Sequence, residues 1–138
     1  MDENLEGIAG QVVDAAVKLH IRVGPGLLES VYEVLLADAL LRRGLSVERQ
    51  KRVTVVLDGR TFERAFRLDL LVEAQLAVEI KSVDTLLTTH WKQLLTYLRL
   101  MDLRLGLLIN FGEAKLKDGL KRVVNRYDGF GSSRLRAR

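Results

Sequence analysis

Residues 66–81, with the sequence FRLDLLVEAQLAVEIK, constrain the fold of this chain more than any other segment. Apolar residues occupy the even-numbered positions, and a period of two indicates β-strands with one face in a core. Only three residues, centred on Ala74, interrupt the alternation, so the segment predicts a tight antiparallel hairpin. The large residues expected to share the core face are Phe66, Leu68, Leu70, Val72, Leu76, Val78 and Ile80.

The opposite face of this predicted hairpin carries four charges. Pairing about Ala74 places Asp69 opposite Glu79 and Arg67 opposite Lys81. Two carboxylates at the roughly 4.5–5.5 Å typical of opposed residues repel each other by about 3 kcal/mol at an effective dielectric of about 20. A divalent cation such as Mg²⁺ between them would remove this cost, and Lys81 would then orient a water molecule or stabilise charge on a phosphate. The same four charges also fit a solvated lattice of cross-strand ion pairs without a metal.

The composition limits the kinds of site that the chain can build. Its 138 residues include no cysteine and only two histidines, His20 and His90, which excludes disulfides, thiolate chemistry and histidine-rich zinc sites. Any metal is therefore expected to be a hard cation with oxygen ligands. The formal net charge of +4 permits a polyanionic partner without requiring one.

Hydropathy and length lead to expectations about localisation and domain organisation. No apolar run approaches the roughly 20 residues of a membrane helix, and the first ten residues lack the pattern of a signal peptide, so we expect a cytoplasmic protein without membrane contacts. The length fits one domain, expected over residues 1–128. Residues 129–138 are rich in glycine, serine and arginine. We expect a flexible basic tail there, either a frayed terminus or an aid to phosphate contacts.

Apolar residues at helical spacing predict three helices. The first spans about residues 4–21, and Pro25 between two glycines ends it. The second is expected over residues 28–43. Its apolar side is expected to contain Val31, Val34, Leu35, Ala39 and Leu41. The third, over residues 88–101, begins with two threonines, which are good N-cap residues.

The remaining patterned segments predict strands. Two extended runs, 47–50 and 53–57, precede a strong Asp58-Gly59 turn, and the next strand continues into the central hairpin. Residues 103–111 form an almost continuous apolar run, which we expect to be an interior strand paired in parallel across a helical crossover. Residues 115–124 fit either a helix or a strand. The expected fold class is α/β in an α+β arrangement, with a mixed sheet flanked by helices.

Two of the predicted helices carry further candidate site residues. Glu29, in the first turn of the second helix, is favoured there by the helix dipole alone, and it lies three residues from Tyr32 on one face. In the third helix, His90, Gln93 and Tyr97 form an uncharged polar stripe. Such a stripe suits a face beside an active site, and it suits a half-buried helix edge as well.

Five short motifs occur in order along the chain. They are GLLESVY at 26–32, DLLV at 69–72, EIK at 79–81, QLLTYL at 93–98 and GLLINFG at 106–112. With these motifs, the chain closely resembles the GxxExxY proteins, a prokaryotic family assigned to the PD-(D/E)xK nuclease superfamily. The resemblance extends over about residues 8–125.

This resemblance implies a restriction-endonuclease-like core with Mg²⁺ at the acidic pair, and Mn²⁺ would be able to replace it. Asp69, Glu79 and the main-chain carbonyl of Ile80 would be metal ligands. The other implied site residues are Lys81 as the catalytic lysine, Glu29 as an additional acid that binds the ion, and Gln93 and Tyr97, which resemble the QxxxY element that RecB-like members place beside their metal site.

The leading hypothesis is a Mg²⁺-dependent phosphodiesterase that cleaves a nucleic acid, with DNA favoured over RNA as the partner. An alternative is a nucleic-acid-binding or partner-binding module that keeps the fold without cleaving. A second alternative is a structural protein whose acids form ion pairs. A homodimer is a further expectation, because a domain this small has much aliphatic helix surface.

Overall fold

The computed structural model of the chain describes residues 1–126, and the predicted tail at 129–138 lies outside this range. The elements are α1 (Glu3–Val23), α2 (Glu29–Arg42), β1 (Val47–Leu57), β2 (Arg60–Val72), β3 (Leu76–Lys81), α3 (Thr88–Met101), β4 (Leu105–Asn110), the short 3-10 helix η1 (Leu116–Gly119) and β5 (Leu120–Val124). The two predicted runs at 47–50 and 53–57 are thus one strand, β1. Residues 115–124, which fitted either a helix or a strand, contain η1 followed by β5.

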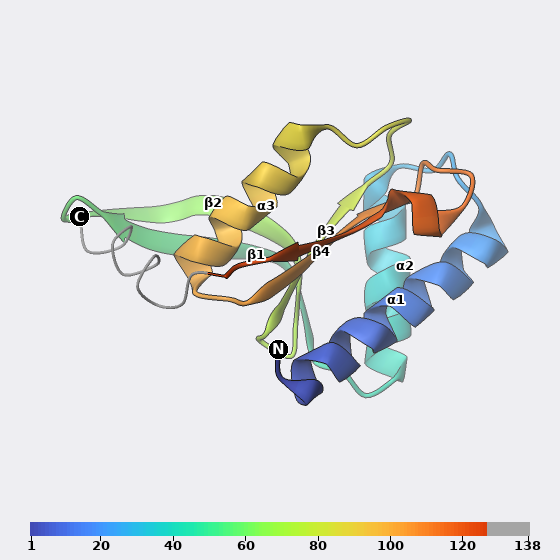
Figure 1. Cartoon of the computed structure of the whole chain (residues 1–138), viewed down its shortest axis with the longest axis horizontal. Helices are drawn as coiled ribbons and strands as arrows, with labels where there is room; N and C mark the ends of the chain where they lie inside the picture. Colours follow the sequence, from blue (N-terminus) through green and yellow to red (C-terminus); the bar gives the residue numbers. More distant parts are fainter. Residues whose placement is uncertain (127–138) are drawn as a thin grey trace.

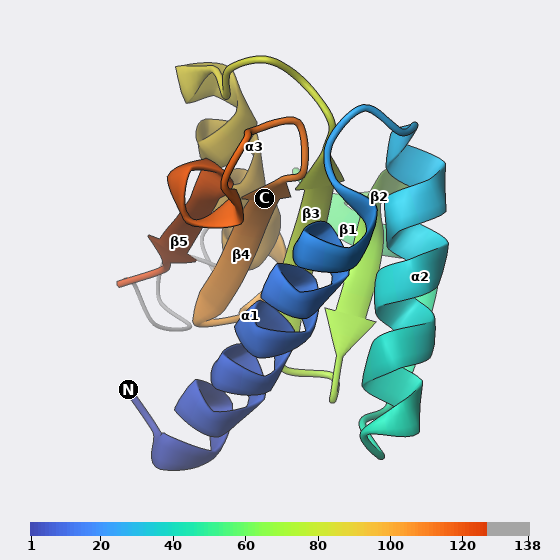
Figure 2. The same ribbon diagram turned by 90° about the vertical axis from the view of Figure 1, so that its right-hand side faces the viewer.

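One mixed sheet contains all five strands, in the order β1-β2-β3-β4-β5. Neighbouring strands are antiparallel except β3 and β4, which are parallel because α3 connects them. Helices α1 and α2 cover one face of the sheet and α3 covers the other (Figures 1 and 2). The α+β arrangement with a mixed sheet is therefore confirmed. Residues 1–126 contain no helix with the length and hydrophobicity of a membrane span.

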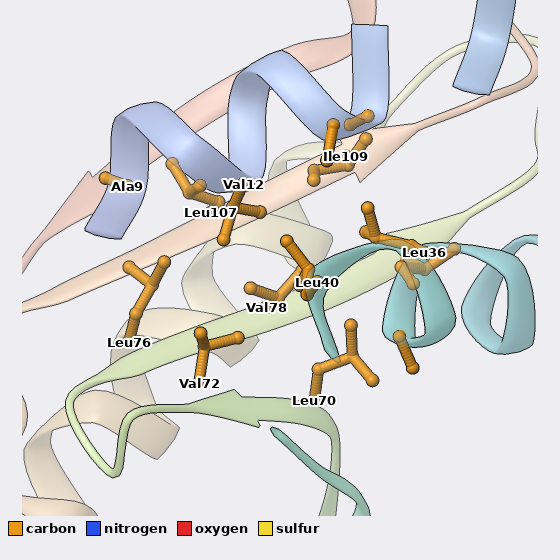
Figure 3. Packing of buried hydrophobic residues seen from close by; sticks show 14 of the residues in the cluster. Ala9, Val12, Leu36, Leu40, Leu70, Val72, Leu76, Val78, Leu107 and Ile109 are labelled. Atoms are coloured by element: carbon orange, nitrogen blue, oxygen red, sulfur yellow. The ribbon is translucent and has the colours of Figure 1, made fainter. Parts of the chain in front are cut away.

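The sheet separates two hydrophobic cores. The larger one lies under α1 and α2, where Val12, Leu36 and Leu40 pack against Val78 and Ile109 of the sheet (Figure 3). The smaller one lies under α3 and contains Leu68, Leu71, Ala77, Leu94, Leu98, Leu108 and Val123. Burial of both faces explains why the central strands read as nearly continuous apolar runs.

The buried face of α2 differs from the predicted one. Val31, Val34 and Leu41 are exposed, with 38%, 38% and 52% of their surface accessible. The buried residues are instead Tyr32, Glu33, Leu36, Ala37 and Leu40. Apolar residues surround this helix on several sides, so their spacing alone could not identify the face that packs on the sheet.

Strand β2 changes faces at Asp69, which the predicted alternation did not include. Leu70 packs in the core under α1 and α2, whereas Leu68 packs in the core under α3 and Phe66 stacks on Tyr97 of that helix. The ladder with β1 skips the pair formed by Gln50 and Asp69, and Gln50 has a φ of 53°. The pairing has the same register on both sides of this skipped pair, so the irregular backbone there, and not a slip of register, turns the side chains that follow. Phe66 and Leu68 therefore lie on the face opposite to the prediction.

The predicted central hairpin is present. Val72 pairs with Leu76, and Glu73 and Ala74 adopt the positive φ values that a tight turn requires. The two strands pair only as far as Leu70 and Val78, so Arg67 does not pair with Lys81. Beyond that pair β2 separates from β3, and a gap opens between them at the position of Asp69.

The start of α3 also differs from the prediction. The N-cap residue is Leu87, not Thr88 or Thr89. The Leu87 N–H donates to Nδ1 of His90, at 3.0 Å, so the imidazole has the role that an N3 acid has in a capping box, and the N-cap residue itself has no hydroxyl.

Candidate active site

Asp69 and Glu79 are held together by two crossed hydrogen bonds. Oε1 of Glu79 accepts the backbone N–H of Asp69 at 3.0 Å, and Oδ2 of Asp69 accepts the backbone N–H of Ile80 at 2.8 Å. Where β2 and β3 separate, these carboxylates accept the backbone N–H groups that carbonyls of the neighbouring strand would accept in a regular ladder. Two acids are thereby fixed side by side by the strands themselves.

The environment of Glu79 disfavours its charge. Only 6% of the residue is exposed, and this burial is the largest cause that raises its pKa, to about 8, with the negative charge of Asp69 adding to the effect. The hydrogen bond from the Asp69 N–H and the positive charge of Lys81 act in the opposite direction without cancelling it. When both acids are ionised, the pair would thus carry more negative charge than its own surroundings neutralise.

Ile80 and Lys81 complete the end of β3. The Ile80 N–H points toward β2, and because the N–H and C=O of one strand residue point the same way, its carbonyl faces the gap as well. The Lys81 carbonyl points the other way and accepts the N–H of Phe111 at 2.8 Å. The Lys81 side chain is half-buried, and within residues 1–126 it forms no ion pair.

Helix α3 brings Tyr97 to the acidic pair. Its ring stacks on Phe66 with centroids 4.0 Å apart, and its pKa is raised by burial and then by the charges of Glu79 and Asp69. Gln93 lies one turn earlier on α3, where it is exposed and its side chain forms no hydrogen bond with any residue of 1–126. The structure therefore places Tyr97 near the acids and leaves Gln93 at the helix surface.

The other predicted acid, Glu29, lies across a cleft from this pair. A cleft of about 760 Å³ is lined by Glu29, Glu33, Gln50, Arg67 and Asp69, together with the loop residues around them. Oε2 of Glu29 accepts the N–H of Ser82 at 3.3 Å. This contact joins the first turn of α2 to the residue that follows Lys81.

The hydroxyl of Tyr32 fixes the loop that leads to Glu29. It donates to the carbonyl of Gly24 at 2.6 Å and receives the N–H of Leu27 at 3.1 Å. The ring is fully buried and stacks on Phe111 with centroids 4.4 Å apart. Tyr32 therefore holds Glu29 in place through the backbone, a role that the spacing of the two residues did not reveal.

Glu33 is a residue of the cleft that the sequence analysis missed. It is 5% exposed, and its carboxylate accepts hydrogen bonds from Arg49, at 3.0 and 3.2 Å, and from the side-chain amide of Gln50. Gln50 is the residue at which β1 leaves the ladder beside Asp69. The available signal was an acid four residues after Glu29, on the side of α2 that also carries Leu36, Ala37 and Leu40.

A family model described as the PD-(D/E)XK nuclease superfamily matches residues 6–123. The chain belongs to this superfamily. A search of curated proteins and a search of solved structures each gave no significant match. The five-stranded mixed sheet with helices on both faces is consistent with the restriction-endonuclease-like fold of PD-(D/E)XK nucleases.

PD-(D/E)XK nucleases generally depend on divalent metal ions, and the acidic pair offers ligands of the kind that such ions use. Asp69 and Glu79 offer hard oxygen donors whose full ionisation their surroundings do not compensate, and the Ile80 carbonyl faces the same gap. Among residues 1–126, no three acidic or histidine side chains are grouped closely enough to bind a metal together. The pair fits a hard divalent cation of the kind that uses one or two carboxylates and retains water, and among residues 1–126 Glu29 is not grouped with it.

Proposed function

We propose that this protein is a divalent-metal-dependent nuclease of the GxxExxY type, with residues 1–128 forming its nuclease domain. Asp69, Glu79 and the Ile80 carbonyl would hold Mg²⁺ or Mn²⁺, and Glu29 would reach it through water. A bound ion of this kind neutralises the carboxylates, polarises a phosphate oxygen and makes a water molecule more acidic. The observation that carries the proposal is the pair of crossed hydrogen bonds, which fixes two acids in a gap of the sheet.

The side chains around the pair would divide the remaining work. Lys81 would orient the attacking water and stabilise charge on the phosphate, because its ammonium group has no other ion-pair partner within residues 1–126. Tyr97 would donate a hydrogen bond to the phosphate or to Lys81, and its raised pKa keeps the phenol protonated. Gln93 would act beside Tyr97 only when the nucleic-acid substrate lies across α3.

A cleavage assay tests the proposal. Single- and double-stranded DNA and RNA are incubated with Mg²⁺ or Mn²⁺ and the wild type, Asp69→Ala or Lys81→Ala. We expect wild-type cleavage and a loss of at least about 100-fold in both variants. Cleavage that survives both substitutions would place the chemistry elsewhere. Glu48→Ala, which removes an exposed acid of β1, is the matched control and should leave the rate unchanged.

A further inference from the structure

Two arginines face each other on the strands that lead away from the acidic pair. Arg52 of β1 and Arg67 of β2 are direct partners in the antiparallel ladder, between the pairs Lys51–Leu68 and Val53–Phe66. Opposed residues share one face of a sheet, with Cβ atoms roughly 4.5–5.5 Å apart. Like charges at this separation destabilise a ladder, so the pair is unfavourable unless an anion lies between the two groups.

No group within residues 1–126 supplies that anion. Both arginines are exposed, and neither forms an ion pair or a side-chain hydrogen bond within residues 1–126. The neighbouring basic residues of β1 are already paired, Arg49 with Glu33 and Lys51 with Glu48. Arg52 and Arg67 therefore differ from Arg49 and Lys51 in having no ion-pair partner among the described residues.

The pair lies beside the candidate active site. Leu68 faces α3, so its neighbour Arg67 faces the opposite side, where it lines the cleft together with Asp69 and Glu29. Arg67 and Asp69 are two residues apart, which corresponds to about 7 Å along a strand. An anion held by both arginines would be adjacent to any group bound at Asp69 and Glu79.

Beyond this pair, β1 and β2 continue as a two-stranded ribbon that extends away from the helices (Figure 1). Arg60 and Arg64 are exposed on the ribbon and also form no ion pair within residues 1–126. Two-stranded ribbons have little stability by themselves, and this one carries an excess of positive charge. The positive groups thus continue outward from the cleft in one direction.

We propose that Arg52 and Arg67 form a phosphate-binding site for the backbone of a nucleic acid whose neighbouring phosphate lies at the acidic pair. This inference rests on the proposed function for the identity of the ligand. Guanidinium groups bind phosphate oxygens in a bidentate manner, and a contact with the backbone carries no sequence preference. The arginine pair positions the nucleic-acid strand, and the β1–β2 ribbon beyond the pair binds the same nucleic acid further along its backbone.

Binding of a fluorescently labelled oligonucleotide, single-stranded or duplex, tests the site in the presence of EDTA, so that neither cleavage nor metal contributes. Each phosphate contact adds about 0.9 to the slope of log Kobs against log salt for duplex DNA and about 0.7 for a single strand. We expect Arg52→Ala and Arg67→Ala each to reduce the slope by about this amount. Each should also weaken binding at low salt by several fold.

Two further variants separate a binding role from a structural one. Arg52→Glu places a carboxylate opposite Arg67, so we expect a melting temperature about 2–4 °C higher together with a loss of binding. Arg52→Lys retains the charge and should retain most of the salt slope. Arg42→Ala, which removes an exposed arginine at the far end of α2 from the cleft, should bind as the wild type does.

The outcomes distinguish this inference from the nuclease assignment. A slope unchanged by Arg52→Ala and Arg67→Ala, or no binding of either oligonucleotide at low salt, would overturn the phosphate site. Arginine-dependent binding without cleavage under Mg²⁺ or Mn²⁺ would retain the site and remove the nuclease function. Cleavage that does not depend on either arginine would retain the nuclease function and remove the phosphate site.

Discussion

The carboxylate of Glu33 accepts a hydrogen bond from the side-chain amide of Gln50, the residue at which β1 leaves its ladder opposite Asp69. Gln50 has a φ of 53°, which a residue with a side chain adopts only when its surroundings favour it. A buried acid on α2 thus stabilises the irregularity that places Asp69 in the gap. Helix α2 supports the candidate site at two points, through Glu33 and through Glu29.

Replacing Glu33 should lower the stability of the folded protein. We expect Glu33→Ala to lower the free energy of unfolding by about 2–3 kcal/mol, because Arg49 and Gln50 lose their acceptor. Chemical denaturation measures this change. Glu48, one residue before Arg49 on β1, forms an exposed ion pair with Lys51. Glu48→Ala should therefore change the free energy of unfolding by less than about 0.5 kcal/mol. Equal effects of the two variants would contradict the role given to Glu33.

The metal-free protein should lose stability as the pH rises from about 4.5 to about 8. Glu79 has a folded-state pKa of about 8 against an ordinary value of 4.5, so in this interval the folded state retains a proton that the unfolded state releases. Thermal melting in EDTA across this range should show the decline, and Glu79→Gln should flatten it. Added Mg²⁺ should raise the melting temperature more at pH 8 than at pH 5. A pH-independent difference between wild type and Glu79→Gln would refute this account.

Removal of the Tyr32 hydroxyl should loosen the loop before α2. Tyr32→Phe retains the stacking on Phe111 and loses the bonds to Gly24 and Leu27, so we expect a cost of about 1–2 kcal/mol. Hydrogen exchange should quicken at the Leu27 amide. Because this loop positions Glu29, any metal-dependent cleavage should fall as well. Unchanged exchange at Leu27 would argue against the loop contact.

Asn110 should be required for the segment that follows Lys81. Its buried side chain receives the N–H groups of Val83 and Gly112 and donates to the Val83 carbonyl, at 2.8–3.0 Å. Asn110→Ala leaves these buried groups unpaired, and we expect a loss of about 2–4 kcal/mol by denaturation. Asn110→Asp keeps the acceptor and loses the donor, so it should be intermediate. A milder effect of alanine than of aspartate would count against this ranking.

Two glycines should respond to alanine in opposite ways. A Cβ at Gly112 would overlap the backbone of Val83, so Gly112→Ala should destabilise the protein strongly. Gly10 lies on the exposed side of α1 with no atom near its missing Cβ, and Gly10→Ala should stabilise by about 0.5–1 kcal/mol. Melting temperatures of the two variants test this contrast. A lower melting temperature for Gly10→Ala would be unexpected.

Local patterns were sufficient to predict much of the fold. The turn at Ala74 and the parallel pairing of β3 with β4 follow from short-range periodicity and from the length of one crossover helix. The stripe of α1 at Ile8, Val12 and Leu19 was also identifiable, because the opposite side of the helix carries charged residues such as Glu3, Asp14 and Lys18. These features depend on residues close together in the sequence.

The parts that could not be predicted depend on contacts between distant residues. The change of faces at Asp69 depends on Gln50 and on its contact with Glu33, which lie 19 and 36 positions earlier in the chain. The buried face of α2 depends on how that helix packs against the sheet, since both of its sides are apolar. The nearness of Asp69 and Glu79 was predictable because one hairpin register determines both positions.

The step at Gln50 and Asp69 has a consequence for how the length of the ribbon can vary. Successive residues of the outward strand segments alternate between faces, except where the register shifts between Val53 and Val55. Removing one residue from each strand within a regularly paired segment would turn the arginines nearer the tip to the other side, whereas removing two would keep their orientation. Natural or engineered length variants that keep the function should therefore differ by even numbers of residues per strand, which would let the reach of the ribbon change while the acids stay in place.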